Sequence, residues 1–458
     1  MNPIESKATR AITVPARSFL VVISALLACP LAQAQPGAVL WTYQAPALIT
    51  SSPALGNDGT VYIGAGALLA VTNAGLAGSN RWTLAVSPGL CAVVGADGTI
   101  YCANGGLYAV NADGTVKWSF QGQGGGSGSA AIGLDNTIYF FAGGRLYAVS
   151  PSGTKKWDFF IGAGGYVDTP FSPVIGADDR IYLAAGTTGK LCAFSPNGTN
   201  EWCANLLSNG AGAAAPAIGT GGIIYYPLGY LSAFSPYGTN IWTTGDQFHS
   251  PPVVAADGTI YSADGTRALD AITPAGQPSW SVLASPARFT STAPAVDAGG
   301  RIYYCTSNSI WALAPQGLVL WKVTQPGDPG PGGDFALTSP IIGPDGTLYA
   351  ALGTTLYAIA TGTNGPANSP WPMYQQNARH TGKVEKPVLK PPQKRSDANF
   401  EFQLYPQQFG LTYTVESSSN LYNWTSVTSF VANMLPTDVV DLTASNAPAR
   451  FYRAFSGP

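Results

Sequence analysis

The sequence predicts an all-β protein: an eight-bladed β-propeller of four-stranded blades with a small C-terminal β-sandwich domain. Three observations predict this fold. A short turn-and-strand unit recurs, with 36 to 46 residues between successive copies, and a tryptophan accompanies each copy. The chain also contains 55 glycines and 36 prolines, enough for many turns between short strands. With 458 residues, 46% of them hydrophobic, it is long enough for two or three domains and too apolar to be disordered.

The repeated unit is clearest as a turn followed by a strand that carries a tyrosine, such as DGTIY at 97–101. An apolar strand precedes most turns, as SPIIG does at 339–343, and a third strand follows, as LYAVN does at 107–111. A fourth strand carries the tryptophan. We name these strands A to D in chain order, with A nearest the propeller axis, because four strands at this period are typical of a blade. The eight tyrosines are Tyr62, Tyr101, Tyr139, Tyr182, Tyr225, Tyr261, Tyr303 and Tyr349.

The tryptophans of the D strands match the tyrosines in number. In six units an alanine lies nine positions before the tryptophan, as Ala109 does before Trp118, and five of these units have a Pro-x-Gly turn in between. A large indole against a small residue suits blades that pack side by side, so we interpret these residues as structural. They are Trp41, Trp82, Trp118, Trp157, Trp202, Trp242, Trp280 and Trp321.

Closure of the ring depends on the N-terminal strand. The last unit, at 339–360, supplies A, B and C, while GAVLWTYQ at 37–44 precedes the first A strand. If 37–44 is the D strand of the last blade, the ring closes and no exposed sheet edge remains there. The alternative uses 368–375, around Trp371, as that D strand and leaves 37–44 as an arm.

These units resemble the PQQ-type propeller repeat, and the Ala-to-Trp spacing is similar to the tryptophan-docking motif of quinoprotein dehydrogenases. The ring also resembles that of BamB-like propellers. The resemblance covers about 37–382, including WPMYQQNARHTG at 371–382. It implies, for the enzymes of the family, PQQ held between a tryptophan and a vicinal disulfide, with calcium ligands and a catalytic aspartate. No two cysteines are adjacent here, so no catalytic residue carries over, and we expect neither PQQ nor Ca²⁺ and no metal site.

The N-terminal 34 residues have the pattern of a secretory signal peptide. Lys7, Arg10 and Arg17 precede an apolar stretch at 18–29, and Ala32-Gln33-Ala34 is a small-x-small cleavage site. We therefore predict an exported protein, periplasmic, secreted or at the cell surface, without a transmembrane span. In the alternative, Leu26-Leu27-Ala28-Cys29 acts as a lipobox and Cys29 carries a lipid anchor.

The ends of the leader and of the repeated units divide the chain into four predicted parts. Residues 1–34 are the signal peptide, 35–382 the propeller, 383–399 an extended linker rich in proline and lysine, and 400–458 a small all-β module. The module resembles C-terminal β-sandwich modules appended to exported bacterial proteins.

Five cysteines remain after the leader. Cys91 and Cys102 are 11 positions apart, as are Cys192 and Cys203, so each pair could bridge neighbouring strands in an oxidising compartment. Whether they do depends on strand register, since a slip of one residue turns a side chain to the other face. The sequence leaves both disulfides open.

The connections from D to the next A strand are long and varied, whereas the A–B turns and most C–D turns are tight. Long loops on a rigid scaffold commonly carry the binding residues, so we predict a ligand-binding rim on the D–A side. The alternative is that its polar residues are ordinary loop residues. The candidates are Tyr166, Asp168, Asp246, Phe248, His249, Arg288, Phe289, Asp334 and Phe335.

The function that these observations favour is a non-enzymatic binding or scaffolding propeller of the cell envelope. Its partner would be an envelope protein, or a saccharide or peptide ligand, and the protein a monomer. The formal charge of −2 gives no basic field for nucleic acid. The alternative is a quinoprotein-like oxidoreductase or a hydrolase with its site on the long-loop rim; a purely structural role is a third possibility.

Overall fold

The structure is a computed structural model of the whole chain. It describes residues 34–124, 128–162, 172–185, 189–206, 214–248, 250–263, 268–283, 292–306, 308–325, 338–384, 388–389, 393–394, 400–405, 412–419, 424–431, 437–441 and 451–457. The predicted signal peptide lies outside this part of the chain except for Ala34.

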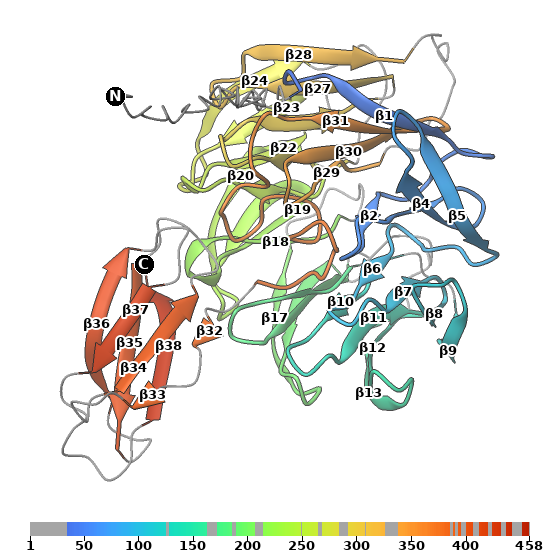
Figure 1. Cartoon of the computed structure of the whole chain (residues 1–458). Coiled ribbons are helices and arrows are strands. Elements are labelled where there is room, and N and C mark those ends of the chain that lie inside the picture. The colour runs from blue at the N-terminus through green and yellow to red at the C-terminus, as the bar shows by residue number, and fades with distance from the viewer. Residues whose placement is uncertain are drawn as a thin grey trace, which may run out of the picture. The chain divides into compact units, whose positions relative to one another are not determined.

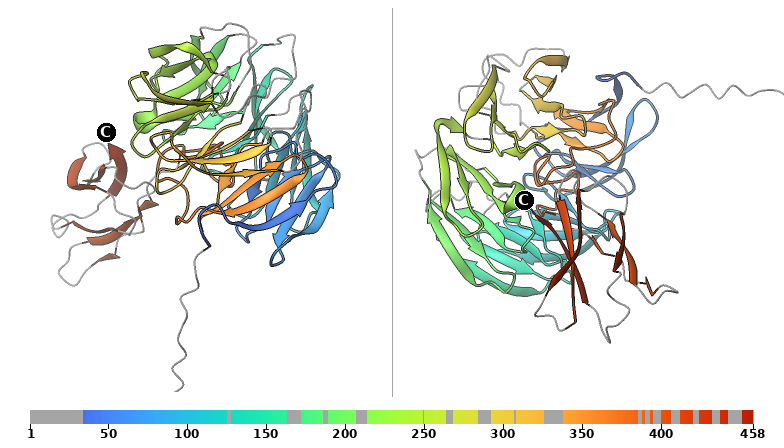
Figure 2. Two further views of the ribbon diagram at one scale, coloured as in Figure 1. Left: turned by 90° about the horizontal axis from the view of Figure 1, so that it is seen from above. Right: turned by 90° about the vertical axis from the view of Figure 1, so that its left-hand side faces the viewer.

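Eight antiparallel sheets form the eight predicted blades, and Figure 2 shows them following one another in chain order from blue to orange. The first four blades each have four strands in the order A to D. Blade 1 contains β2 (Ala54–Leu55), β3 (Val61–Gly64), β4 (Leu68–Asn73) and β5 (Gly78–Leu84). Blade 2 contains β6 (Val93–Val94), β7 (Ile100–Ala103), β8 (Gly106–Val110) and β9 (Val116–Gln121). Blade 3 contains β10 (Ala131–Ile132), β11 (Ile138–Ala142), β12 (Arg145–Val149) and β13 (Lys155–Phe160). Blade 4 contains β14 (Val174–Ile175), β15 (Ile181–Ala185), β16 (Lys190–Phe194) and β17 (Asn200–Asn205).

Blades 5 to 8 repeat this plan with one variation. Blade 5 contains β18 (Ala217–Ile218), β19 (Ile224–Phe234) and β20 (Asn240–Phe248), after a single 3₁₀ turn, η1 (Thr220–Gly222). Blade 6 contains β21 (Val253–Val254), β22 (Ile260–Ala263), β23 (Ala268–Ile272) and β24 (Pro278–Leu283). Blade 7 contains β25 (Ala295–Val296), β26 (Ile302–Cys305), β27 (Ser309–Leu313) and β28 (Val319–Thr324). Blade 8 contains β29 (Ile341–Ile342), β30 (Thr347–Leu352), β31 (Thr355–Ala360) and β1 (Val39–Gln44).

The variation in blade 5 is the fusion of B and C. Its sheet has three strands because β19 covers both positions in one element of 11 residues. Gly229, with a φ of 77°, lies where the other blades have their B–C turn, and glycine takes this left-handed conformation without strain. The number of blades therefore stays at eight, while one sheet departs from the four strands predicted.

The predicted closure of the ring is confirmed. Strand β1 pairs antiparallel with β31, so the last sheet runs in the order β1-β31-β30-β29. Trp41 lies opposite Ala358, and its ring centroid is 5.9 Å from that of Tyr349. The alternative, in which the segment around Trp371 supplies the last D strand, is wrong.

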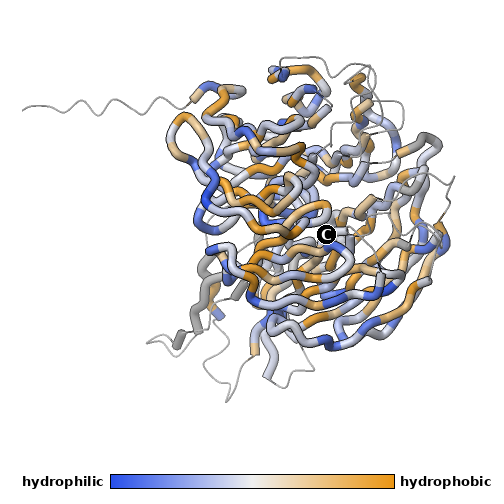
Figure 3. The backbone as a smooth tube through the Cα atoms, turned by 90° about the vertical axis from the view of Figure 1, so that its right-hand side faces the viewer, coloured by the Kyte–Doolittle hydropathy of each residue, from blue (hydrophilic) through white to orange (hydrophobic). Residues whose placement is uncertain are grey.

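The core lies along the inner strands of the ring. The A strands are buried, as are nearly all residues of B and C, whereas D strands alternate, as in the exposed and half-buried positions of β28. In Figure 3 hydrophobic residues follow the strands inside the ring, and hydrophilic residues gather at turns and outer edges. The described residues contain no helix with the length and apolar character that a membrane crossing takes.

The C-terminal residues form two further sheets. One contains β32 (Val388–Leu389), β33 (Gln393–Lys394), β34 (Phe400–Tyr405) and β37 (Thr437–Asp441). The other contains β35 (Thr412–Ser418), β36 (Thr425–Val431) and β38 (Phe451–Gly457). Tyr413 and Val415 from one sheet share a buried cluster with Val439 from the other.

The segment 383–399, predicted as an extended linker, is shared between the two parts. Lys383 forms an isolated parallel β-bridge with Ile175, and Val384 donates its N–H to Ile175 O (2.9 Å). Lys383 and Val384 therefore belong with the propeller. Strands β32 and β33 pair with β34, so residues 388–389 and 393–394 belong with the C-terminal sheets.

Candidate functional site

The eight D-strand tryptophans, which we call the tryptophan girdle, join neighbouring blades. Each indole lies 5.7 to 6.0 Å from the B-strand tyrosine of its own blade, as Trp118 does from Tyr101. Six indoles also donate a hydrogen bond to the C–D turn of the next blade. These bonds run from Trp82 to Ala112 O, Trp118 to Pro151 O, Trp157 to Pro196 O, Trp202 to Pro236 O, Trp242 to Pro274 O and Trp280 to Pro315 O, at 2.8 to 3.0 Å.

The turn glycine under each of these six indoles is required by this packing. At Gly153, φ is 85°, and a Cβ atom would lie 2.8 Å from Trp118 Cδ2. The last two members of the girdle use glycines outside C–D turns: Trp321 packs over Gly37, and Trp41 over Gly78. Trp321 Nε1 is buried and has no hydrogen-bond partner among the described residues. The girdle thus continues through blade 8, where the N-terminal strand β1 closes the ring.

The propeller axis is filled by residues 366–384, which we call the axial segment. Figure 1 shows it as the orange chain that follows β31 and passes among the inner strands β2, β18 and β29. Its carbonyl groups accept hydrogen bonds from the second residue of six A strands, at 2.7 to 2.9 Å. The pairs, donor first, are Leu55 with Ala378, Val94 with Arg379, Ile132 with Thr381, Ile175 with Gly382, Val254 with Trp371 and Val296 with Pro372.

The axial segment enters from the rim formed by the A–B and C–D turns, which we call the turn rim. Ala298, in the A–B turn of blade 7, donates its N–H to Gly365 O (3.0 Å), and Thr361 Oγ1 donates to Gly346 O (2.6 Å) in that of blade 8. The second residue of each A strand also lies next to its A–B turn. The opposite rim, formed by the D–A and B–C connections, is the loop rim on which the sequence predicts ligand binding.

His380 anchors the axial segment to blade 1. Its side chain is fully buried, with Nδ1 2.9 Å from Tyr374 O and Nε2 2.6 Å from Pro53 O. Burial lowers the pKa of the imidazole, and the two carbonyl contacts oppose that shift. A neutral imidazole has one N–H and can donate to only one of these carbonyls. His380 therefore serves as a structural anchor: one ring nitrogen donates to a carbonyl oxygen, and the other lies close to the second carbonyl.

Tyr374 extends the axial network to blades 2, 3 and 4. Its hydroxyl lies 3.2 Å from both Ser129 Oγ and Ser172 Oγ, and Ser129 Oγ is 2.9 Å from Cys91 Sγ. Burial raises the pKa of Cys91 to about 12 and raises that of Tyr374 as well. Neither group is an anion at neutral pH, so the network supplies hydrogen bonds and no activated nucleophile.

Three residues of the axial segment adopt a left-handed backbone without being glycine. They are Gln375, Gln376 and His380, with φ of 52°, 74° and 57°. The Gln375 side chain is fully buried. Each residue held in a strained backbone conformation costs on the order of 1–3 kcal/mol, so strong contacts elsewhere must hold the segment in place.

The comparisons with known proteins agree with this architecture. The family model described as outer membrane protein assembly factor BamB matches residues 31–226 and 227–365, which is more than half of the sequence. The chain belongs to this family. No curated protein sequence matches it.

Solved structures show the same fold as this BamB-family propeller. BamB from Moraxella catarrhalis aligns with a TM-score of 0.52 and 15% identity, over 70% of this chain and 97% of that one. The C-terminal WD40 domain of Sif2 gives a TM-score of 0.52 and 12% identity over 71% and 96%. Virginiamycin B lyase from Staphylococcus aureus gives 0.45 and 12% over 59% and 93%, a likeness too low to carry an argument. At these identities the likeness concerns the fold alone. The chain is a PQQ-like β-propeller.

Most of the predicted rim residues of this BamB-family chain lie outside the described residues. Phe248 ends β20, is 2% exposed and belongs to the same buried cluster as Tyr226 and Leu231. Asp246 lies in the same strand. The candidates outside the described residues are Tyr166, Asp168, His249, Arg288, Phe289, Asp334 and Phe335.

Phe248 also lines a small hollow between blades 5 and 6. The hollow has a volume of about 220 Å³, and its walls come from β20, β23 and the turn before β24. Thr243, Thr244, Asp270 and Gln277 supply its polar groups. The described part of the chain holds no group of three His, Cys, Asp or Glu residues that could bind a metal ion.

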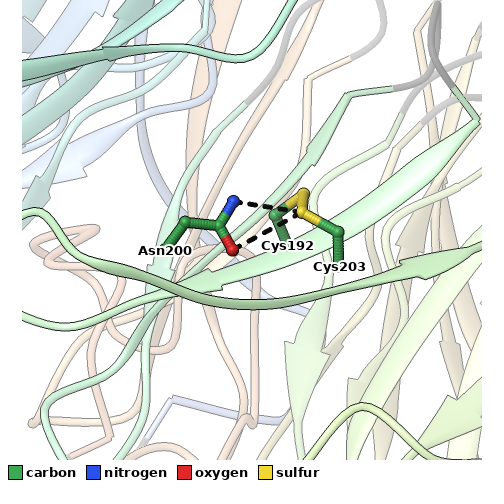
Figure 4. Close-up of a disulfide and its surroundings, with 3 residues drawn as sticks. All are labelled: Cys192, Asn200 and Cys203. Atoms are coloured by element: carbon green, nitrogen blue, oxygen red, sulfur yellow. Dashed lines mark hydrogen bonds between the residues drawn. A yellow bond between two sulfur atoms is a disulfide. The ribbon is translucent and has the colours of Figure 1, made fainter.

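Strand register determines which of the two cysteine pairs forms a disulfide. Cys192 in β16 lies directly opposite Cys203 in β17, and their sulfur atoms are bonded at 2.03 Å (Figure 4). Asn200 Nδ2 donates to Cys203 Sγ at 3.2 Å. In blade 2, Val93 pairs with Tyr101, so the same register would place Cys91 opposite position 103. Cys102 is one residue out of step and faces the other side, and Cys91, Cys102 and Cys305 are free buried thiols.

The sequence analysis missed the axial segment as a structural element. In the sequence, WPMYQQNARHTG carries part of the family resemblance and 368–375 is the alternative D strand, because the segment occurs once and has no period that would place it at the axis. The signal that could have located it is its position: an aromatic segment follows the last C strand, although β1 already supplies the missing D strand.

Proposed function

We propose that this chain is an exported, non-enzymatic propeller of the cell envelope that binds a protein partner, or a saccharide or peptide ligand, on its loop rim. Membership of the family described as outer membrane protein assembly factor carries the proposal. The solved structure named BamB aligns over nearly the whole of that chain. Rigid propellers present binding residues on their long connections, and here these are the D–A connections.

The axial segment, which fills the propeller axis, supports the choice of the loop rim as the binding face. Six A strands use their inner backbone groups to hold the axial segment near the turn rim. The turn rim itself is built from tight turns closed by local bonds, as between Asp97 and Thr99. The loop rim is left as the face with long and varied connections.

Export is supported by the leader and by the Cys192–Cys203 disulfide. Disulfides persist in oxidising compartments, and this one is on the outer edge of blade 4. Cleavage after Ala34 keeps β1 (Val39–Gln44), the strand that closes the ring. The intact mass of the mature chain tests the processing site: an N-terminus at Gln35 supports signal-peptide cleavage, whereas a lipidated N-terminus at Cys29 supports the lipid anchor instead.

We also propose that binding requires neither PQQ nor Ca²⁺. The sequence has no adjacent cysteines, and burial raises the pKa of Cys91, the thiol that contacts Ser129 in the axial network, to about 12. Purified protein should show no quinone absorbance and no calcium-dependent dye reduction. Turnover of an alcohol or a sugar would instead support the alternative, an oxidoreductase or hydrolase on the loop rim.

The binding face is tested with two matched variants in a pull-down from an envelope extract. One replaces the charged loop-rim candidates Asp168, Asp246, His249, Arg288 and Asp334 with alanine. The control replaces three exposed C–D turn residues of the turn rim, Leu76, Tyr237 and Leu318. We expect a protein captured by the wild type to be lost only by the loop-rim variant. Equal capture by both variants would contradict the proposal. Gel filtration of the wild type tests the prediction that the protein is a monomer.

A further inference from the structure

The axial segment is held like a bound peptide. Six of its carbonyl groups accept hydrogen bonds from A strands of only two residues, and Ala367 and Val384 donate their N–H groups back to Val296 O and Ile175 O. Each of these A strands pairs with a B strand on one side and turns its other edge to the axis. Such free edges are the groups through which sheets recognise extended peptides. Here the edges of six blades act together on one segment.

Side chains of the axial segment enter separate parts of the core. Trp371 and Val384 join the cluster of blades 4 to 6, Met373 and Ala378 that of blades 7, 8 and 1, and Tyr374 that of blades 6 and 7. Trp371 is 1% exposed and is the largest fully buried side chain of the described residues. Buried aromatic anchors with satisfied backbone groups around them are typical of tight peptide recognition.

The ring matches its family without this segment. The family model ends at residue 365, and the axial segment begins at the next residue. The chain that leads from the end of β31 to the axial segment, 361–365, includes the exposed residues Gly362 and Asn364. The covalent link therefore lies on the surface, while the contacts that hold the segment lie inside the ring.

We propose that the turn-rim end of the propeller axis is a binding site for an extended peptide, and that residues 366–384 are its resident ligand. The site recognises main-chain carbonyls through the A-strand N–H groups, an indole through the pocket around Trp371, and an imidazole through Pro53 O. It lies at the opposite end of the axis from the loop rim and does not depend on the function proposed for that rim.

The test separates the segment from the ring without unfolding either. Protease recognition sites are inserted at Asn364 and between Val384 and Val388 of the full chain, and the folded protein is cut at both. We expect the released peptide to stay with the ring through gel filtration at about 1 μM protein, as native mass spectrometry would show, which requires a Kd well below about 1 μM. Loss of the peptide from the ring would overturn the proposal.

Two variants and one measurement sharpen the test. In the doubly cut chain, Trp371→Ala should lower peptide retention at least about tenfold, the loss of 1.4 kcal/mol or more, whereas Tyr237→Ala, on an exposed turn, should leave it unchanged. Equal retention in all three proteins would overturn the site. If the insertions prevent folding, hydrogen exchange on the unmodified chain decides: the amides of Leu55, Val94 and Val254 should be as protected as those of B strands, and rapid exchange would refute the proposal.

Discussion

The tryptophan girdle and the axial segment stabilise the same ring in opposite ways. The girdle packs an indole over a glycine eight times at the perimeter, and all of the indoles except Trp41 are half-buried. The axial segment occurs once, at the centre, and most of its side chains, including those of Trp371 and His380, are buried. The girdle therefore distributes stability over equivalent contacts, whereas the axis concentrates it in a few residues. A single substitution should cost more at the axis than at the perimeter.

Trp371→Ala should have the largest effect. Removing a fully buried indole leaves a cavity, and such changes lower the free energy of unfolding by about 3–5 kcal/mol. Urea unfolding followed by circular dichroism measures the loss. Trp118→Ala is the matched control, since its indole is only half buried, and we expect a smaller loss there. Equal losses would contradict the concentration of stability at the axis.

The same contrast explains what the sequence could predict of the fold. Every blade repeats the same local packing, so Trp41 and Tyr349 could be assigned to one sheet although they lie near opposite ends of the propeller sequence. The contacts of the axial segment are unique and distant in sequence: Ser369 Oγ bonds to Val254 O, and His380 to Pro53 O, 327 positions away. Periodicity carries no information about such pairs.

The candidate site was less predictable for a related reason. Loop length located the rim, but nothing in the sequence indicated that Phe248 continues β20 into the core. The other rim residues stay predictions. The disulfides show the limit most directly, because two cysteine pairs of identical spacing fall on different strand pairs, C–D in blade 4 and A–B in blade 2, and only the first pair is in register.

Loss of the disulfide should have the next largest effect. The bond joins cysteines 11 positions apart, and closing a loop of that size stabilises a protein by up to about 3 kcal/mol. The double variant Cys192→Ala, Cys203→Ala should therefore unfold at lower urea concentration, though still above Trp371→Ala. Dithiothreitol should lower the midpoint of the wild type and leave that of the double variant unchanged. A wild type insensitive to dithiothreitol would contradict this role for the perimeter bond.

Acid should weaken the axis through His380. Burial lowers the pKa of its imidazole, so between the pH of the ordinary histidine pKa and the lowered one the unfolded chain binds more protons than the folded chain. Stability therefore falls as the pH drops through this range, by at most about 2 kcal/mol between pH 7 and pH 5. His380→Gln should remove this part of the pH dependence, while the carboxylates titrate alike in both proteins. If the free energy of unfolding depends on pH in the same way in both proteins, His380 does not contribute to the pH dependence.

The smallest effect should distinguish two members of the girdle itself. Trp118 donates a hydrogen bond to Pro151 O at 2.8 Å, whereas Trp321 Nε1 has no partner among the described residues. Replacing either with phenylalanine removes a similar apolar area, but only Trp118→Phe also removes a hydrogen bond. We expect Trp118→Phe to cost about 1 kcal/mol more than Trp321→Phe in urea unfolding. Equal costs would mean that the indoles join the blades by packing over their glycines alone, and that the six regular hydrogen bonds set the orientation of the rings without adding stability.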